Sequence, residues 1–207
     1  MRKRLFAWLY GRFDRRTREV TAGLRADLVG DLTGEILEIG CGPGGNFAHY
    51  AAGARVTATD YNEHMLERAR TEAASEPVAA SIAVERADAD ALRFPTASFD
   101  AVVSTLVLCS VTSLDRTLDE IRRVLRPGGE LRLWEHVRSA NRLLAAAQTA
   151  ATPLYRPLAD GCHLNRDTGA AVRRAGFEVL SEDHPTVGGH PLPNLVMIAR
   201  KPLDSDA

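Results

Sequence analysis

Four glycines, Gly40, Gly42, Gly44 and Gly45, follow a short apolar run of strand character at residues 36–39. A glycine-rich turn between a strand and a helix lets backbone N–H groups and a helix N-terminus approach a ligand, because no Cβ stands in the way. The spacing satisfies two patterns at once. Gly40-x-Gly42-x-x-Gly45 is the dinucleotide fingerprint, and Gly40-x-Gly42-x-Gly44 is the looser pattern of S-adenosylmethionine enzymes.

Two acidic residues favour one of these ligands. Asp60 lies 20 residues after Gly40 and ends an apolar run at 56–59, so its carboxylate is placed to accept both hydroxyls of a ribose. Glu38 comes two residues before Gly40, where it would repel the doubly negative pyrophosphate of a dinucleotide and attract the ammonium and sulfonium of S-adenosylmethionine. We therefore predict an S-adenosylmethionine site, with S-adenosylhomocysteine as the product.

The composition describes one ordinary globular domain over residues 1–207. Of the 207 residues, 45% are hydrophobic and 26% are charged, which suits one well-buried core. The formal net charge of -1 gives no general attraction to nucleic acid. Cys41, Cys109 and Cys162 are far apart and odd in number. We therefore expect a reducing, cytoplasmic compartment, no disulfide framework and no metal site.

Residues 1–28 are predicted to form an amphipathic helix that acts as a lid on the domain. Its apolar residues fall near helical spacing, with arginines mostly around them: Leu5, Trp8, Leu9, Phe13, Val20, Leu24 and Leu28. The basic surface leaves open a peripheral contact with anionic lipid or the gating of an apolar substrate. The first apolar stretch is too short for a signal peptide, and no segment reaches the ~20 apolar residues of a membrane span. We expect no integral membrane segment.

Strands and helices alternate along the rest of the chain. Strands are expected at 36–39, 56–59, 81–85, 101–106 and 130–137, and helices at 47–52, after the cap Asn62, at 113–125 and at 166–175. Such alternation predicts an α/β fold with a doubly wound, mostly parallel sheet. Two last strands, at 177–180 and 195–200, predict an antiparallel C-terminal hairpin, which argues against a typical dinucleotide domain.

These features together resemble the class I S-adenosylmethionine-dependent methyltransferases over nearly the whole chain. The matching motifs lie at residues 38–44, 60, 88, 94–100 and 125–129. The resemblance implies a Rossmann-like sheet of seven strands. It also implies that the glycine turn holds the methionine part of the cofactor, that Asp60 holds the ribose and that Tyr61 packs on the adenine. The remaining cofactor residues it implies are Asp88 and Ala89 at the adenine amino group, Thr105 at the sulfonium, and Asn46 and Met65.

A narrower resemblance, at residues 104–111, 134–137 and 161–168, is to the methyltransferase-like thiol S-methyltransferases. It implies methyl transfer to a small, fairly apolar acceptor, most simply a thiol. Members of that family carry an N-terminal membrane anchor, which we do not expect here. Residues 138–165 are predicted to shape the acceptor pocket, with apolar walls from Leu143, Leu144, Pro153, Leu154, Tyr155, Pro157 and Leu158.

The attacking atom decides whether a base is needed. A thiol is already a few per cent thiolate at neutral pH, whereas an amine or alcohol must lose a proton to a base. His136, directly past the fifth strand, is the candidate catalytic residue, and a structural hydrogen-bonding role is its alternative. Other readings stay open: an N-, O- or C-methyltransferase acting on a quinone, phospholipid amine or natural product, an NAD-dependent oxidoreductase, and a non-catalytic binding module.

Overall fold

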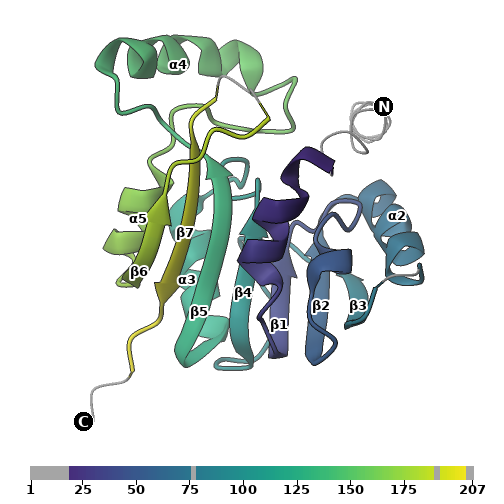
Figure 1. Cartoon of the computed structure of the whole chain (residues 1–207). Coiled ribbons are helices and arrows are strands. Elements are labelled where there is room, and N and C mark those ends of the chain that lie inside the picture. The colour runs from purple at the N-terminus through teal and green to yellow at the C-terminus, as the bar shows by residue number, and fades with distance from the viewer. Residues whose placement is uncertain (1–18, 76–77, 189–191, 204–207) are drawn as a thin grey trace.

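The computed structural model describes residues 19–75, 78–188 and 192–203. Seven strands form one sheet in the order β3-β2-β1-β4-β5-β7-β6 (Figure 1). All neighbours are parallel except β7, which is antiparallel to both β5 and β6. The strands are β1 (Gly34–Ile39), β2 (Ala54–Asp60), β3 (Ser81–Arg86), β4 (Phe99–Thr105), β5 (Leu125–His136), β6 (Glu178–Asp183) and β7 (Asn194–Arg200). The predicted doubly wound, mostly parallel sheet with an antiparallel C-terminal hairpin is confirmed.

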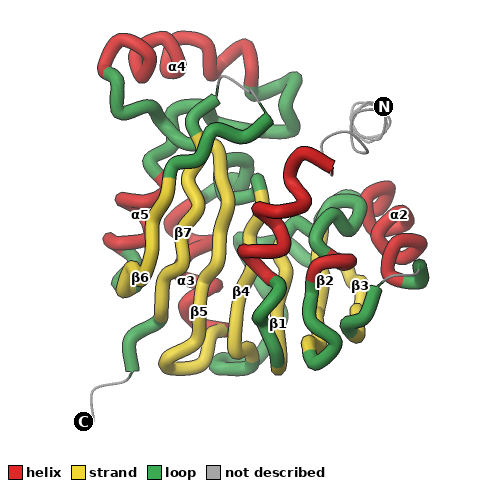
Figure 2. Tube along the Cα trace, viewed as in Figure 1, coloured by secondary structure: helices red, strands yellow, loops and turns green. Residues whose placement is uncertain are grey.

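Helices cover both faces of the sheet (Figure 2). The helix at residues 19–29 and α2 (Glu63–Ala73) pack on one face, and α3 (Leu114–Val124) and α5 (Thr168–Arg174) pack on the other. Successive side chains of β1 alternate between these layers. Ile36 belongs to the apolar cluster of the helix at 19–29 and α2, and Leu37 belongs to the cluster of α3 and α5. Among the helices of the described part of the chain, none is long and apolar enough to cross a membrane.

The predicted crossover helix at 47–52 is wrong in length. Only the 3-10 turn η1 (Phe47–His49) forms there. The pairing of Gly34 with Ala54 sets the start of β2, which leaves room for a single turn after the glycines. The preceding Asn46 makes no side-chain cap, because its Oδ1 accepts from Arg25 while its Nδ2 donates to Glu38 and Thr105.

The predicted turn at 126–129 forms as a bulge inside β5 rather than before it. Phe99 pairs with Leu125 and Ala101 with Glu130, so the four residues between them loop out of the ladder. Gly128 has φ +79°, a conformation that a side chain would disfavour. The strand therefore begins at Leu125, five residues earlier than the sequence suggests.

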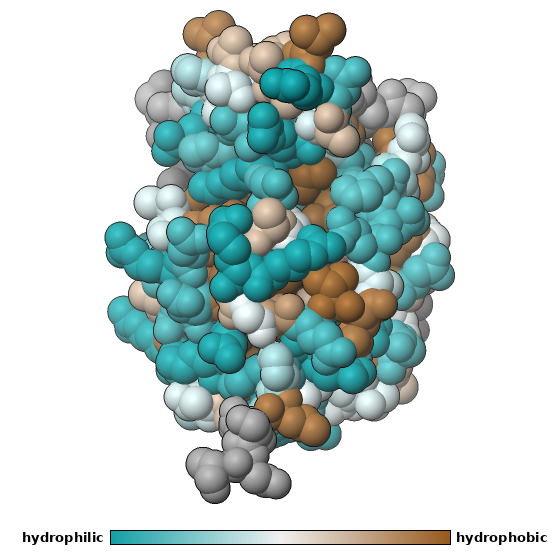
Figure 3. All heavy atoms as spheres, turned by 90° about the vertical axis from the view of Figure 1, so that its left-hand side faces the viewer, coloured by the Kyte–Doolittle hydropathy of each residue, from teal (hydrophilic) through white to brown (hydrophobic). Residues whose placement is uncertain are grey.

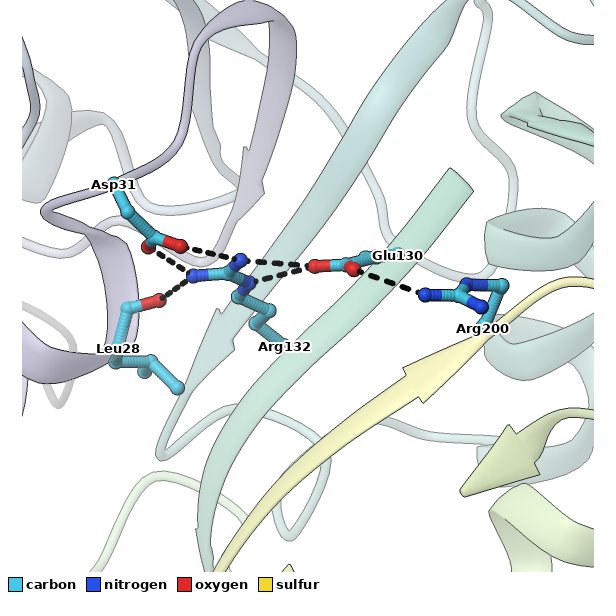
Figure 4. Close-up of polar contacts among 5 residues, drawn as sticks. All are labelled: Leu28, Asp31, Glu130, Arg132 and Arg200. Atoms are coloured by element: carbon cyan, nitrogen blue, oxygen red, sulfur yellow. Dashed lines mark hydrogen bonds and ion pairs between the residues drawn. The ribbon is translucent and has the colours of Figure 1, made fainter. Parts of the chain in front are cut away.

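The helix at residues 19–29 is fastened to the sheet by a buried arginine of β5 (Figure 4). Arg132 is 7% exposed, donates to the Leu28 carbonyl oxygen at 3.0 Å and pairs with Asp31. On its other side, Arg132 pairs with Glu130 at 2.9 Å. This part of the predicted N-terminal lid is packed on a sheet face. Residues 1–18, which carry most of the predicted basic stripe, lie outside the described residues.

The helix α4 (Arg142–Tyr155) lies above the end of the sheet, apart from the two packed layers (Figure 1). It begins at Asn141, whose side chain accepts hydrogen bonds from the backbone N–H groups of Leu143 and Leu144 at 2.9 and 3.2 Å. Apolar side chains gather on the outer surface over this helix (Figure 3). With α4 in this position, residues 142–155 lie beyond the carboxyl ends of the strands, next to the pocket that forms there.

Candidate active site

A pocket of about 520 Å³ lies where β1, β2, β4 and β5 end. This carboxyl edge is the usual ligand site of an open α/β sheet. Among the predicted cofactor residues, those that line it are Gly40, Gly42, Asp60, Tyr61, Met65, Asp88, Ala89 and Thr105. The other three, Glu38, Gly44 and Asn46, do not line this pocket. The fold thus brings most of the predicted set together around one cavity.

The glycine turn leaves the pocket floor open. Gly40 has φ +59°, and a Cβ there would lie 2.4 Å from a methyl carbon of Val107. Gly42 has φ +55°, and a Cβ there would have no atom within 4 Å, since it would project into open space. The first glycine is needed for close packing of the β4 loop against the turn, and the second keeps space free for a ligand. An extended polar group of a cofactor can therefore lie against this turn.

Asp60 connects the glycine turn to the start of α2. One carboxylate oxygen accepts from the Gly42 N–H at 3.0 Å, and the other accepts from the Asn62 N–H at 2.8 Å. Burial raises the pKa of Asp60, and these N–H groups oppose the rise. A carboxylate has about four acceptor sites, so these two bonds leave capacity on a pocket-lining side chain. That capacity suits the two hydroxyls of a ribose.

The predicted adenine residues lie at the outer part of the pocket. The Tyr61 hydroxyl donates to Asp160 at 2.7 Å, which joins the β2 end to the segment after α4. Asp88 is exposed, and one of its carboxylate oxygens accepts from the Asp90 N–H at 3.0 Å. Asp90 itself accepts from the Ser113 N–H at 3.0 Å and so is committed to the start of α3. Asp88 is therefore the acid of this loop that remains accessible to an adenine amino group.

Glu38 lies behind the pocket wall, 2% exposed. Its two carboxylate oxygens accept from the Asn46 amide and the Tyr50 hydroxyl, each at 2.9 Å. Burial raises its pKa to about 7, while Tyr50, Arg25 and Asn46 oppose the rise. The same Asn46 amide donates to the Thr105 hydroxyl at 3.0 Å. Glu38 thus holds the side chains that shape the pocket, in addition to any long-range attraction for a positive ligand.

The opposite wall is organised by Glu135, which the sequence analysis did not single out. Its fully buried carboxylate accepts from the Ser104 hydroxyl at 2.7 Å and from the backbone N–H groups of Val107, Leu108 and Cys109 at 3.0, 2.9 and 3.1 Å. Burial raises its pKa, and these donors oppose the rise. The available signal was an acidic residue beside Leu133 and Trp134 at the end of the fifth strand, where a buried charge needs several partners.

Three side chains far apart in sequence meet on this wall. The thiols of Cys109 and Cys162 and the imidazole of His136, here called the thiol–imidazole cluster, have ligand atoms within 4.8 Å of one another. All three residues line the pocket. The interaction with Cys109, with a further contribution from His136, lowers the pKa of Cys162 to about 5, whereas that of Cys109 is raised well above its usual range.

The segment at 138–165 contributes to the pocket differently from the prediction. Its lining residues are Tyr155, Ala159, Asp160 and Cys162. Of the predicted apolar walls, Tyr155 lines the pocket, whereas Leu143, Leu154 and Leu158 are 84%, 78% and 80% exposed. These leucines belong to the outward face of the segment, so the predicted apolar wall is wrong for them. The side chains that this segment does contribute are the ring of Tyr155, the methyl group of Ala159, the carboxylate of Asp160 and the thiol of Cys162.

Comparison with known proteins gives consistent matches. A family model described as a methyltransferase domain matches residues 37–133. Thiol S-methyltransferase TMT1B of Rattus norvegicus is 36% identical over 190 residues, which are 87% of this chain and 75% of the relative. The Homo sapiens TMT1B is 40% identical over 156 residues, which are 72% of this chain and 63% of that protein. Phosphatidylethanolamine N-methyltransferase of Cereibacter sphaeroides is 31% identical over 159 residues, covering 75% of this chain and 76% of the relative.

Solved structures with the same architecture carry different chemistry. An S-adenosylmethionine-dependent methyltransferase from Mesorhizobium loti has a TM-score of 0.64 and 23% identity, covering 87% of this chain and 97% of its own. The cyclase SpnF has a TM-score of 0.69 and 22% identity, covering 92% of this chain and 81% of its own. At these identities the likeness shows the fold alone.

Proposed function

The chain belongs to the family of S-adenosylmethionine-dependent methyltransferases, and from that membership we propose that its methyl acceptor is a small, fairly apolar thiol. The observation that carries the proposal is the 36% identity to a thiol S-methyltransferase over 87% of the chain. That span includes both walls of the pocket. A second support is the nature of the acceptor wall, which offers sulfur and imidazole groups rather than a set of strong bases.

The cofactor half of the pocket fits S-adenosylmethionine, which when bound supplies an activated methyl group on a positive sulfur and leaves as S-adenosylhomocysteine. Gly40 and Gly42 provide the open turn, and Asp60 has free acceptor capacity for the ribose. Asp88, Ala89, Tyr61 and Met65 line the part assigned to the adenine. Thr105 lies at the end of β4, between this half and the acceptor wall, and its hydroxyl is fixed by Asn46.

The acceptor would enter opposite Thr105, against the thiol–imidazole cluster. This wall must hold the acceptor sulfur in line with the methyl group and keep out water. Tyr155 and Ala159 provide apolar contact on the same wall. Because a thiol is partly ionised at neutral pH, alignment alone achieves much of the rate enhancement, and no essential base is needed. We propose a cytoplasmic location, in keeping with three free cysteines.

The main rival is an amine or a quinone acceptor. It is favoured by the likeness to the phosphatidylethanolamine N-methyltransferase and, over 105 residues at 36% identity, to the ubiquinone/menaquinone C-methyltransferase UbiE of Pseudomonas putida. Either acceptor would require His136 to act as an essential base. The UbiE match covers 51% of this chain, a smaller share than the thiol S-methyltransferase match.

The purified full chain can decide between these acceptors. S-adenosylhomocysteine formation would be measured with a thiol, an amine, a phenol, a quinol and phosphatidylethanolamine vesicles. We expect saturable turnover with the thiol, rising with pH toward the acceptor's own pKa. Turnover with the vesicles or the quinol, and none with the thiol, would contradict the proposal.

A further inference from the structure

The thiol–imidazole cluster has the composition of a transition-metal site. Cys109 follows β4, His136 ends β5 and Cys162 follows α4, and their ligand atoms lie within 4.8 Å of one another. Around a tetrahedral Zn²⁺, with Zn–S near 2.3 Å and Zn–N near 2.0 Å, ligand atoms are roughly 3.5–3.8 Å apart. Shifts of about 1 Å in side-chain position would bring the cluster to that geometry.

The backbone around the cluster is held in place independently of any ion. Glu135 accepts the Cys109 N–H at 3.1 Å, and the Cys109 carbonyl oxygen accepts the His163 N–H at 2.8 Å. Arg166 donates to the carbonyl oxygens of Leu108 and Val111 at 2.5 and 2.6 Å. These bonds hold the backbone that carries Cys109 and join it to the backbone next to Cys162. The two thiols are thus positioned by the fold, with small adjustments left to the side chains.

One coordination position would remain open to the pocket. Cys109, His136 and Cys162 line the same cavity as Thr105 and the glycine turn. Three protein ligands with a fourth position open to substrate is the pattern of catalytic zinc, whereas structural zinc has four protein ligands. Two sulfur ligands and one imidazole select a borderline-soft cation over Mg²⁺ or Ca²⁺.

We propose that Cys109, His136 and Cys162 bind one Zn²⁺ ion, and that the sulfur of the acceptor thiol takes the fourth position. This proposal rests on the proposed thiol acceptor. On coordination the S–H bond of the acceptor breaks, a Zn–S bond forms and the proton leaves to solvent, so the acceptor is held as a thiolate at neutral pH. His136 then acts as a metal ligand rather than as a base.

Metal binding can be tested without any methyl acceptor. The reduced, metal-free full chain would be titrated with Co²⁺, which reports tetrahedral thiolate ligation by its absorption, and then with Zn²⁺ in competition. We expect one equivalent to bind with sulfur-to-cobalt charge-transfer bands. Cys109→Ser, Cys162→Ser and His136→Gln should each weaken binding more than about a hundredfold, since even partners outside the ligand set contribute about 10–100-fold.

Matched controls use the remaining cysteine and the neighbouring histidine. Cys41→Ser and His163→Gln should keep the cobalt spectrum, because neither residue belongs to the cluster. Absence of the spectrum in the reduced wild type, or its persistence in Cys162→Ser, would overturn the metal site. Full thiol methylation by a chelator-treated, metal-free protein would overturn the coordination of the acceptor sulfur while leaving the proposed thiol function intact. Metal binding together with methylation of amines only would overturn the proposed function and its coordinated thiol, leaving the cluster as an ion site.

Discussion

The two walls of the pocket are built in different ways. Most of the cofactor wall comes from residues 40–65, in which Asp60 accepts from the N–H of Gly42 and from that of Asn62, and the loop after β3 adds Asp88 and Ala89. The acceptor wall is assembled from the end of β5 and from the segments that follow β4 and α4, and Glu135 and Arg166 hold its loop by hydrogen bonds to the backbone. The cofactor wall is determined mainly by the spacing of residues close in sequence, whereas the acceptor wall depends on the whole fold.

This difference separates cofactor binding from acceptor specificity in physical terms. A turn with positive φ at Gly40 and Gly42 can be placed in any sheet of this kind and still present the same open cradle. The acceptor wall changes whenever the loops after the strands change, because those loops supply its side chains. SpnF and the Mesorhizobium loti methyltransferase share the fold and differ in the reactions their names state.

The largest expected effect is on the cofactor wall. Asp60→Ala should weaken S-adenosylmethionine binding by roughly 2–4 kcal/mol, because two charge-assisted hydrogen bonds to the ribose are lost. Calorimetry of the variant and of the exposed-acid control Asp119→Ala measures the difference. The cobalt spectrum expected from the acceptor wall should stay unchanged in both. An unchanged cofactor affinity in Asp60→Ala would remove the ribose assignment.

Glu38, which lies behind the cofactor wall, should make the free energy of unfolding depend on pH. Burial raises the pKa of Glu38 from 4.5 to about 7, so the folded state binds a proton that the unfolded state releases. Its contribution is complete below about pH 4.5 and is lost as the pH rises through 7. The free energy of unfolding of the wild type, relative to Glu38→Gln, should fall by up to about 3 kcal/mol over this range.

Urea unfolding of both proteins at several pH values measures that fall. The exposed Glu67→Gln serves as the control and should follow the wild type. A free energy of unfolding of the wild type that rises with pH relative to Glu38→Gln would show that the Glu38 carboxylate is stabilised by its partners more than it is destabilised by burial.

Tyr61 touches both walls, so its variants measure how far they depend on each other. Tyr61→Phe removes the hydroxyl that donates to Asp160 and keeps the ring. It should weaken cofactor binding by about 1 kcal/mol, the typical net value of a hydrogen bond. Tyr61→Ala also removes the ring and should cost more. Equal losses in the two variants would mean that packing of the ring on the adenine contributes nothing.

The smallest expected effect is at the outward face of α4. Leu154 is 78% exposed, so Leu154→Ser should leave the free energy of unfolding within about 0.5 kcal/mol and the KM for a thiol within about twofold. Tyr155→Ala, its neighbour on the pocket wall, should raise that KM. If both variants raise KM equally, the exposed leucines do contact the acceptor.

The sequence predicts most of the cofactor wall, but it does not predict how the acceptor wall is assembled. The sheet, the glycine turn and Asp60 follow from alternation and short spacing, because local sequence determines them. The meeting of Cys109, His136 and Cys162 could not be read from spacing, because it depends on which strand ends lie side by side. Leu143 and Leu154 were assigned to the pocket because they are apolar, but apolar character does not show which way a side chain faces, and both face outward.

The central claim, that the acceptor wall takes a thiol, is tested most directly by acceptors that differ in one atom. The kcat/KM of the wild type would be measured with 2-phenylethanethiol, 2-phenylethylamine and 2-phenylethanol, which share one skeleton. We predict turnover of the thiol at least about a hundredfold faster than that of either analogue, because only the thiol forms an anion at neutral pH without a strong base. Methylation of the amine as fast as the thiol, lost in His136→Ala, would contradict the account.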